Sequence, residues 1–432
     1  MPGKSGALSE AEDMTQKGMH VCLMNDSFPP VIDGVANCVQ NYADIIEREL
    51  GYSLVCTPDY PNALDNYVYP VLRYPSFDLT KAFGYRAGMP FDRKTISLLE
   101  QWPSDVIHAH CPIMSMVLAR TLRELIHKPI ILTYHSKFEV DIQQDIASPT
   151  MQEQATRAIL SNIEAADAVW TVSEGASRSL RALGYRGEYL VMPNGVDLPL
   201  GAASPEAVRG VNERLNLSPD MPVFLFIGRL MWYKGIRQIL DAIRLLKTDV
   251  RPFRMLFVGD GQEKDEIVQY AKNTGIDDCV TFLPAISDRE ELRAYYSRGD
   301  LFLFPSEYDT NGLVVHEAAA CATASVTLTG SCAAEGVIDG QNGLTVDATP
   351  ESLARACKQM LANPQYMREM GDHAQKELYL SWEDSVRHAY TEYERVCRDY
   401  SERRYPPRNG KSDRFFRTVS KLYKSSKSDK TK

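Results

Sequence analysis

Two cations follow the apolar segment VFLFI at 223–227. Arg229 comes directly after Gly228, and Lys234 lies five residues further along. Two cations on a loop at a strand end can bracket a diphosphate and neutralise the charge that develops on a leaving group. Solvated surface cations are the alternative interpretation. The chain contains no GxxxxGKS/T sequence, so this loop is not a P-loop.

The segment FPSEYDTNGLVVHEAAA at 304–320 carries two carboxylates, Asp309 and Glu317. Its sequence predicts a strand end, a polar loop and then a helix. The two acids could therefore bind hydroxyl groups at two points of a long polar ligand. Helix N-termini leave backbone N–H groups unpaired and bind anions. The amides expected to form such a site are those of Asn311, Gly312, Leu313 and Val314.

Two further turns are rich in glycine. Gly34 begins a predicted helix, where a phosphate could approach the backbone closely. An ordinary strand-to-helix turn is the alternative. Gly259, Asp260 and Gly261 follow the apolar segment RMLFV and predict a sharp turn suited to a planar ring.

His108, His110 and His135 lie at predicted strand ends, where a ring can reach a cleft. A structural role is the alternative for each. His108 is better explained as a structural residue. His108 and His110 could begin a metal site, but the sequence offers no evident third ligand. The chain has no DxD triplet, and His316 cannot begin an HExxH motif because residue 320 is alanine. We therefore expect no metal.

The elements that must position these residues alternate along the chain. Short runs of Val, Ile, Leu and Phe, separated by amphipathic stretches, are typical of parallel strands covered by helices on both faces. The pattern occurs twice, which predicts an α/β protein with two doubly wound, Rossmann-like sheets. Such sheets bind ligands at the carboxyl ends of their strands, so we expect one ligand in a cleft between the halves.

We expect five segments in the chain, with Pro, Gly and Ser residues marking the central boundary. They are a flexible N-terminus at 1–18, an N-terminal domain at 19–200, a C-terminal domain at 201–380, a helix at 381–400 that crosses back onto the N-terminal domain, and a basic tail at 401–432.

Composition excludes several classes of protein. A length of 432 residues is too long for one compact module, and a net charge of −9 argues against a nucleic-acid partner. Nine cysteines without a CxxC pair predict no disulfide framework or zinc ribbon. No apolar stretch approaches the ~20 residues that span a bilayer, and the polar N-terminus is unlike a signal peptide. We expect a cytoplasmic protein.

The tail at 401–432 differs from the rest of the chain. It carries a net charge of +8, which leaves −17 for the remainder. A basic segment with interleaved apolar residues can bind an anionic membrane surface, and would then make the protein peripheral on the inner face of the cell membrane. A disordered, solubilising tail is the alternative. The apolar residues concerned are Phe415, Phe416, Leu422 and Tyr423.

Together and in this order, the motifs resemble those of the retaining glycosyltransferases of family 4, which have the GT-B fold. The resemblance extends from about residue 19 to 397. Within it, the segment 77–95 resembles the same region of bacterial diacylglycerol glucosyltransferases. The family resemblance is most specific in DTNGLVVHEAAA, where Asp309 and Glu317 take the places of paired glutamates. MPNGVD, GRLMWYKG and VGDG also match.

The resemblance implies a hexosyltransferase that uses a UDP- or GDP-hexose, with UDP favoured, and needs neither a metal nor a tightly bound cofactor. Arg229 and Lys234 would hold the diphosphate, while His135 would face the transferred sugar and Asp309 would bind it. The other implied contacts are Gly34 with the phosphate, Glu317 with the ribose, Gly259–Gly261 and Leu283 with the nucleobase, and the amides of 311–314 with phosphate and sugar.

The chain departs from the family pattern in four places. Asp309 is one methylene shorter than the usual glutamate, and Asp33 stands where a second glycine is common. Pro284 replaces a frequent glycine, and CATAS at 321–325 replaces a CGTPS-like turn. None of these changes removes a cation or the glycine at the helix start, so we expect activity.

No carboxylate is an evident nucleophile on the opposite face of the sugar. Front-face attack therefore fits best, with the leaving diphosphate accepting the proton of the acceptor while Arg229 and Lys234 stabilise its charge. The tail and 77–95 favour a lipid acceptor such as diacylglycerol. The alternatives are a soluble or polysaccharide acceptor, a sugar-nucleotide epimerase of the same fold, and a non-catalytic binding module.

Overall fold

The computed structural model describes residues 18–31, 33–79, 86–248, 252–406 and 410–428. The expected flexible N-terminus lies outside these residues, apart from residue 18. The described chain divides into two compact units. The first unit comprises the residues up to 172, 176–192 and those from 382 onward, and the second comprises 173–175 and 193–381.

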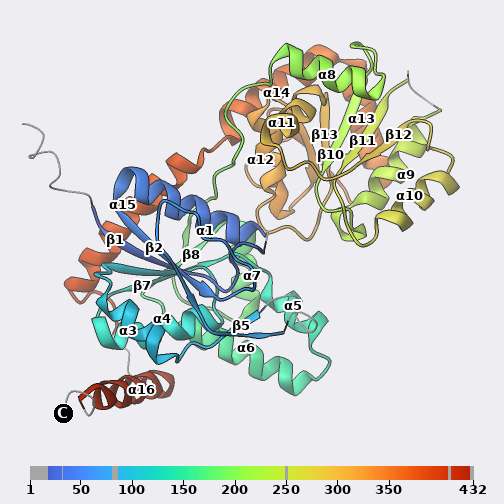
Figure 1. The fold of residues 1–432 in the computed structure, drawn as a ribbon. Helices are drawn as coiled ribbons and strands as arrows, with labels where there is room; N and C mark the ends of the chain where they lie inside the picture. Colours follow the sequence, from blue (N-terminus) through green and yellow to red (C-terminus); the bar gives the residue numbers. More distant parts are fainter. Residues whose placement is uncertain (1–17, 32, 80–85, 249–251, 407–409, 429–432) are drawn as a thin grey trace, which may run out of the picture. The chain divides into compact units, whose positions relative to one another are not determined.

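The first unit contains a seven-stranded parallel sheet with helices on both faces (Figure 1). Its strand order is β3-β2-β1-β6-β7-β8-β9. The strands are β1 (His20–Met24), β2 (Tyr52–Pro58), β3 (Val71–Tyr74), β6 (Val106–Ala109), β7 (Ile130–Tyr134), β8 (Ala168–Thr171) and β9 (Leu190–Val191). A separate antiparallel pair joins β4 (Ser76–Asp78) to β5 (Arg86–Gly88).

Two apolar cores cover the faces of this sheet. One includes α1 (Gly34–Ile45) and α15 (Trp382–Ser401), and the other includes α3 (Arg93–Gln101) and α4 (Met114–Ile126). The remaining helices are α5 (Phe138–Asp145), α6 (Pro149–Ile163), α7 (Glu174–Leu183) and α16 (Lys411–Ser428). The predicted helix that begins at Gly34 ends at Ile45 and continues as a π-helical turn, Ile46–Leu50.

The second unit contains a six-stranded parallel sheet in the order β12-β11-β10-β13-β14-β15. The strands are β10 (Val223–Ile227), β11 (Arg254–Val258), β12 (Val280–Leu283), β13 (Leu301–Phe304), β14 (Ser325–Leu328) and β15 (Gly343–Val346). Its helices are α8 (Pro205–Leu215), α9 (Ile236–Leu246), α10 (Lys264–Asn273), α11 (Arg289–Arg298), α12 (Leu313–Ala320), α13 (Pro350–Ala362) and α14 (Pro364–Leu378).

The strand order reverses once in each sheet. The chain builds outward from β1 to β3 and then returns to the other side of β1 with β6; β10, β12 and β13 repeat this course. At such a switch point the connections leave on opposite faces of the sheet, which opens a crevice at the carboxyl ends of the strands. The predicted α/β class with two Rossmann-like halves is confirmed, and the switch points lie at β1/β6 and β10/β13.

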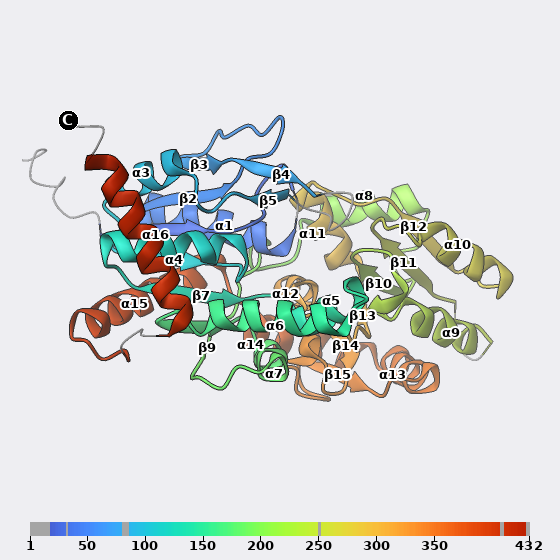
Figure 2. The same ribbon diagram turned by 90° about the horizontal axis from the view of Figure 1, so that it is seen from below.

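The tail beyond 401 contains an ordered helix. α16 packs along α4 (Figure 2), with Phe416 and Tyr423 buried. The buried Arg120 of α4 pairs with Asp413 at 3.1 Å, and its guanidinium lies 4.2 Å from the centroid of the Phe416 ring. The alternative of a disordered tail is therefore wrong for Lys411–Ser428, and two of its four apolar residues serve packing.

Removing the Asp413 carboxylate should detach α16 from α4. Asp413→Ala leaves the buried Arg120 charge unpaired, and breaking such a pair costs about 3–5 kcal/mol. We expect amide hydrogen exchange in α16 to accelerate at least about a hundredfold. The matched control is Glu206→Ala, which removes an exposed pair with Arg209 that solvent screens strongly. Unchanged exchange in Asp413→Ala would contradict this anchoring role.

Candidate functional site

The switch point of the second sheet brings two predicted residues into contact. Lys234 ends a short 3₁₀ turn, Trp232–Lys234, after β10, and Asp309 lies in the loop after β13. Lys234 Nζ lies 2.5 Å from Asp309 Oδ1, and both side chains are largely buried. The pair therefore joins two loops that are 75 residues apart in the chain.

Gly235 is the residue that allows these loops to meet. It has φ of 79°, a left-handed conformation that glycine adopts freely. A Cβ atom there would lie 2.1 Å from the backbone oxygen of Pro305. Only glycine can therefore bring the loop after β10 this close to the end of β13.

The loop after β13 contains several polar atoms without protein partners. Asp309 Oδ2, Asn311 Nδ2 and Ser306 Oγ are buried and make no hydrogen bond among the described residues. Buried polar atoms in native proteins are nearly always hydrogen-bonded. Three such atoms within six residues therefore indicate a place for a polar ligand.

The start of α12 adds backbone donors to this loop. Gly312 has φ of 63°, and a Cβ there would lie 2.7 Å from Ala333 Cα. The N–H groups of Leu313 and Val314 fall in the first turn of α12, where no helical acceptor exists. The predicted amide site and the unpartnered polar atoms thus belong to one continuous segment, 306–314.

Glu317 lies further along α12 in a different environment. Its carboxylate accepts a 2.7 Å hydrogen bond from the Tyr296 hydroxyl and lies 3.7 Å from the Arg289 guanidinium. Burial raises the pKa of Glu317, while the Tyr296 hydrogen bond and the Arg289 charge oppose this rise. The sequence prediction missed Tyr296 and Arg289, because nothing distinguishes them from other residues of an amphipathic helix.

The glycine-rich turns of the second unit line a cavity of about 270 Å³. A Cβ at Gly259 would lie 2.0 Å from the Gly228 carbonyl oxygen, so the turns after β10 and β11 require glycine where they touch. Leu283 is not among the lining residues; its carbonyl accepts a hydrogen bond from Gly259 at 3.2 Å. The cavity is lined by Ile227, Gly228, Arg229, Val258, Gly259, Asp260, Ala285, Ile286 and Leu292.

In the first unit, the start of α1 differs from the predicted phosphate contact. Asp33 is the N-cap, and its carboxylate accepts from the amides of Val35 at 2.9 Å and Ala36 at 2.7 Å. A negative charge therefore already occupies the helix start at which Gly34 was expected to meet a phosphate. A Cβ at Gly34 would meet nothing within 4 Å, so packing does not require glycine there.

The histidines of the first unit follow neighbouring strands. Both ring nitrogens of His108 are occupied, by the Tyr393 hydroxyl at 2.6 Å and Thr133 Oγ1 at 2.7 Å, which makes it structural as expected. His110 Nδ1 lies 3.1 Å from His135 Nε2. Burial lowers the pKa of His135 to about 3, so this ring is neutral near pH 7.

The structure reveals a third candidate metal ligand, Cys38, that the sequence gave no reason to select. Cys38 Sγ and one ring nitrogen each of His110 and His135 all lie within 4.8 Å of one another. His108 does not belong to this set, because Tyr393 and Thr133 occupy both of its ring nitrogens. The residues of such a cluster come from α1 and from the ends of β6 and β7.

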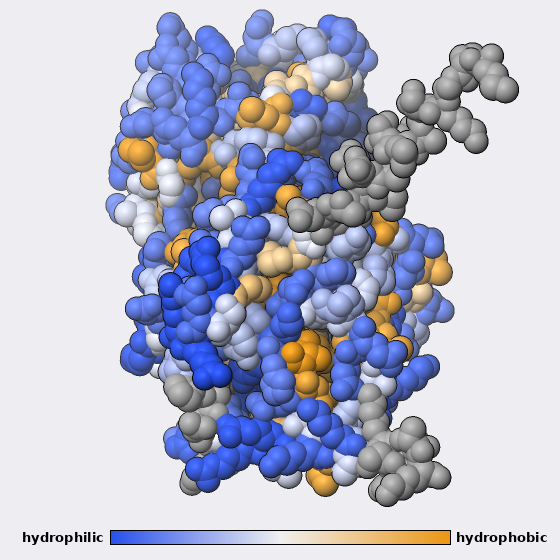
Figure 3. All heavy atoms as spheres, turned by 90° about the vertical axis from the view of Figure 1, so that its left-hand side faces the viewer, coloured by the Kyte–Doolittle hydropathy of each residue, from blue (hydrophilic) through white to orange (hydrophobic). Residues whose placement is uncertain are grey.

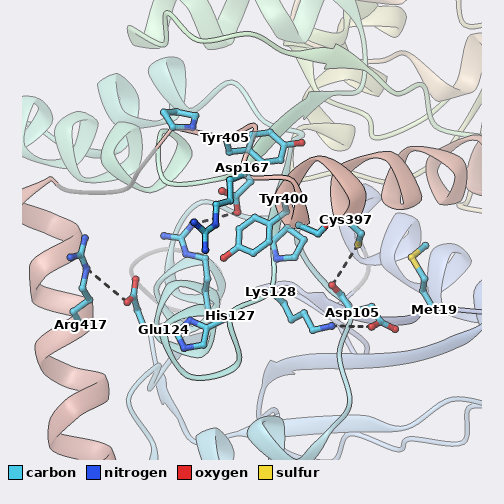
Figure 4. Close-up of a pocket in the computed structure, with 15 residues that line it drawn as sticks. Met19, Asp105, Glu124, His127, Lys128, Asp167, Cys397, Tyr400, Tyr405 and Arg417 are labelled. Carbon is cyan, nitrogen blue, oxygen red and sulfur yellow. Dashed lines mark hydrogen bonds and ion pairs between the residues drawn. The ribbon is translucent and has the colours of Figure 1, made fainter.

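A larger cavity of about 940 Å³ lies elsewhere in the first unit (Figure 4). Asp105 precedes β6 and Asp167 precedes β8, so this cavity lies at the amino ends of the strands. Several of its charges pair with one another, Lys128 with Asp105 at 3.1 Å and Arg417 with Glu124 at 3.9 Å. Within the described residues, no side chain that lines this cavity has a buried polar atom without a partner, and the cavity does not lie at the carboxyl edge of the sheet as the site in the second unit does.

Two sequence families match the chain. The family described as Glycosyltransferase Family 4 matches residues 32–199, and the one described as Glycosyl transferases group 1 matches residues 211–377. Between them they cover most of both units. The chain is a GT-B glycosyltransferase. The enzyme is a hexosyltransferase, as the resemblance implied, and each of its two units matches one of these families.

The relatives of this glycosyltransferase act on different kinds of acceptor. It is 24% identical to the alpha-monoglucosyldiacylglycerol synthase of Streptococcus pneumoniae over 71% of the chain and 70% of that protein. It is 28% identical to the glycogen synthase of Mycobacterium tuberculosis over 66% of the chain and 67% of that protein. A similar solved structure is HepE of Anabaena in complex with UDP-glucose, with a TM-score of 0.68, 20% identity, and coverage of 87% and 99% of the two chains.

Comparing alanine substitutions at Gly235 and Gly275 should separate the stability cost of backbone strain from the cost of a clash between the two loops. Gly235→Ala places Cβ against Pro305, whereas Gly275→Ala, with φ of 69° and nothing within 4 Å of its Cβ, imposes strain alone. We expect Gly275→Ala to cost about 1–2 kcal/mol of unfolding free energy in urea titration. Gly235→Ala should cost clearly more, and equal costs would show that the loops do not depend on this contact.

Proposed function

We propose that this glycosyltransferase moves a hexose from a UDP-hexose to a hydroxyl group of a lipid such as diacylglycerol, with retention of anomeric configuration and without a metal. The observation that carries the proposal is the Lys234–Asp309 pair at the switch point, beside buried polar atoms that lack partners. A cation, an acid and free helix amides are the groups needed to hold a sugar diphosphate.

The donor would lie along the carboxyl edge of the second sheet. The cavity behind Gly228 and Gly259 would take the nucleobase, and Glu317 on α12 would bind the ribose. Arg229, which is exposed, and Lys234 would bind the diphosphate. A UDP-sugar is favoured by the resemblance to HepE, whose solved complex contains UDP-glucose. GDP-hexose is the alternative donor.

The reaction would break the anomeric C–O bond of the donor. The acceptor hydroxyl attacks the anomeric carbon on the face that the diphosphate leaves, and its proton passes to a departing phosphate oxygen. Lys234, Arg229 and the amides at the start of α12 would stabilise the charge on this leaving group. By resemblance alone, we extend the proposal to Gly34, next to the phosphate, and to neutral His135, next to the sugar.

Removing the Lys234 ammonium should lower turnover far more than it lowers stability. We expect Lys234→Ala to reduce kcat about 10²–10³-fold, the effect typical of losing one donor to a developing anion. The matched control is Lys247→Ala, because that lysine pairs with Asp278 on the surface. Turnover is measured as UDP release from UDP-glucose in micelles containing diacylglycerol. A Lys234→Ala enzyme with near-normal kcat would remove the diphosphate role.

A lipid acceptor is supported by the outer face of α16. Phe415 and Leu422 are seven residues apart and more than half exposed, with the exposed cations Arg414 and Lys421 beside them. The Phe415 ring meets the half-exposed ring of Phe91, with centroids 6.0 Å apart. The face in Figure 3 is largely hydrophilic at its lower end, where α16 lies, which fits surface contact rather than insertion. Within the described residues, no helix has both the length and the apolarity to span a bilayer.

Removing these two side chains should weaken binding to anionic vesicles. The double variant Phe415→Ser with Leu422→Ser keeps every charge, and we expect its vesicle affinity to fall at least about tenfold, because each side chain can contribute ~1.5–3 kcal/mol on burial. The control removes exposed apolar side chains elsewhere in the same unit, Val68→Ser with Met151→Ser. Sedimentation with phosphatidylglycerol vesicles measures both, and equal binding would contradict the membrane role.

A polysaccharide acceptor is the second candidate, favoured by the similarity to a glycogen synthase. The two candidates differ in where the transferred sugar is found. With radiolabelled UDP-glucose, a lipid acceptor moves label into the organic phase, and a glucan acceptor moves it into ethanol-insoluble material. Label recovered only as free sugar, or as the isomerised sugar nucleotide, would favour the epimerase.

A further inference from the structure

Three side chains of the first unit converge at the carboxyl edge of its sheet. β1, β6 and β7 are neighbours in the sheet, His110 and His135 directly follow β6 and β7, and Cys38 lies in the second turn of α1. All three side chains are buried. Cys38 Sγ and a nitrogen of each ring fall within 4.8 Å of one another.

His110 has a buried polar atom without a protein partner among the described residues. Its Nδ1 faces His135 Nε2 at 3.1 Å, while its Nε2 is buried and makes no hydrogen bond among the described residues. His108 does not relieve this deficit, because Tyr393 and Thr133 occupy both of its nitrogens. The unpartnered Nε2 would carry the proton of a neutral imidazole, which leaves Nδ1, facing His135 and near the Cys38 thiol, as the nitrogen that can bind a metal.

The spacing suits a tetrahedral ion. Zinc binds imidazole nitrogen at ~2.0–2.1 Å and thiolate sulfur at ~2.3 Å, which places neighbouring ligand atoms roughly 3.3–3.6 Å apart. The observed N···N distance of 3.1 Å and the 4.8 Å limit for the whole set are close to this requirement. One thiolate and two imidazoles favour zinc and other borderline-soft cations over magnesium or calcium, which prefer oxygen ligands.

We propose that Cys38, His110 and His135 form a binding site for a borderline-soft divalent cation such as Zn²⁺, with a fourth position open to water. Binding replaces the His110–His135 hydrogen bond with two metal–nitrogen bonds, and forms a metal–sulfur bond as the Cys38 thiol releases its proton to solvent. Each imidazole stays neutral: the proton of the His110–His135 hydrogen bond moves to the other nitrogen of its own ring, so that both metal-binding nitrogens carry a lone pair.

The site would have a regulatory effect, and this part rests on the proposed function. His135 is the side chain we place next to the transferred sugar, and a bound cation would withdraw its Nε2 from that role. Zinc would therefore inhibit sugar transfer rather than support it.

Cobalt is the probe that tests the site directly. Co²⁺ is titrated into full-length, metal-free protein, and a thiolate-to-cobalt charge-transfer band is expected at one equivalent. Cys38→Ser should abolish the band, whereas Cys22→Ser, which alters another buried thiol of the same unit, should leave it intact. His110→Gln should weaken Co²⁺ binding at least about tenfold, as a lost ligand would. Absence of the band in the natural chain, or its persistence in Cys38→Ser, would overturn the proposal.

Two further measurements keep the outcomes separate. If Cys38→Ser melts below the natural chain, Cys38→Ala replaces it, since a small apolar side chain suits the buried position. Sugar transfer is then measured with and without Zn²⁺ in the natural chain and in Cys22→Ser, both of which should be inhibited. A cobalt band without zinc inhibition would confirm the site and overturn only its effect on transfer, whereas inactivity in the absence of metal would bear on the proposed function instead.

Discussion

The reversal of strand order at β10 and β13 is the constraint on which the proposed donor site depends. Because the chain leaves these neighbouring strands toward opposite faces, two loops meet over one edge of the sheet. Gly235 lets them touch, and Lys234 and Asp309 then bridge them. The same reversal at β1 and β6 gathers histidines in the first unit, so one topological rule produces both of the chemical clusters.

Charge in the second unit is balanced locally before any ligand binds. Asp309 neutralises Lys234, and Arg289 lies beside Glu317, so neither buried acid depends on distant charges. A diphosphate would exchange one anionic partner of Lys234 for another, which limits the desolvation cost of binding. The free amides of α12 add positive potential without adding a titratable group, since a helix N-terminus carries partial positive charge.

Spacing and residue type predicted much of the fold and named residues that the structure brings together, such as Lys234 and Asp309. The apolar runs gave most of the strands, and glycines at their ends marked the turns where loops touch, as at Gly259. Three-dimensional partners could not be read in this way. Tyr296 contacts Glu317 from another helix. Cys38 lies near His110 and His135 because α1 begins at the same edge of the sheet at which β6 and β7 end. Two other features had local signals that were overlooked, since Asp33 is a common N-cap residue and Phe416 and Tyr423 are one heptad apart.

Because α16 packs on α4, a chain shortened before α16 would lose part of the fold of the first unit. Without residues beyond 410, Arg120 of α4 would lose Asp413, its anionic partner, and the surface that receives Phe416 and Tyr423 would face water. Such a surface promotes self-association. A chain ending there would be prone to aggregation and open to cellular proteolysis. Nonsense mutations late in the reading frame should therefore lower the amount of enzyme in the cell rather than yield an active shorter form.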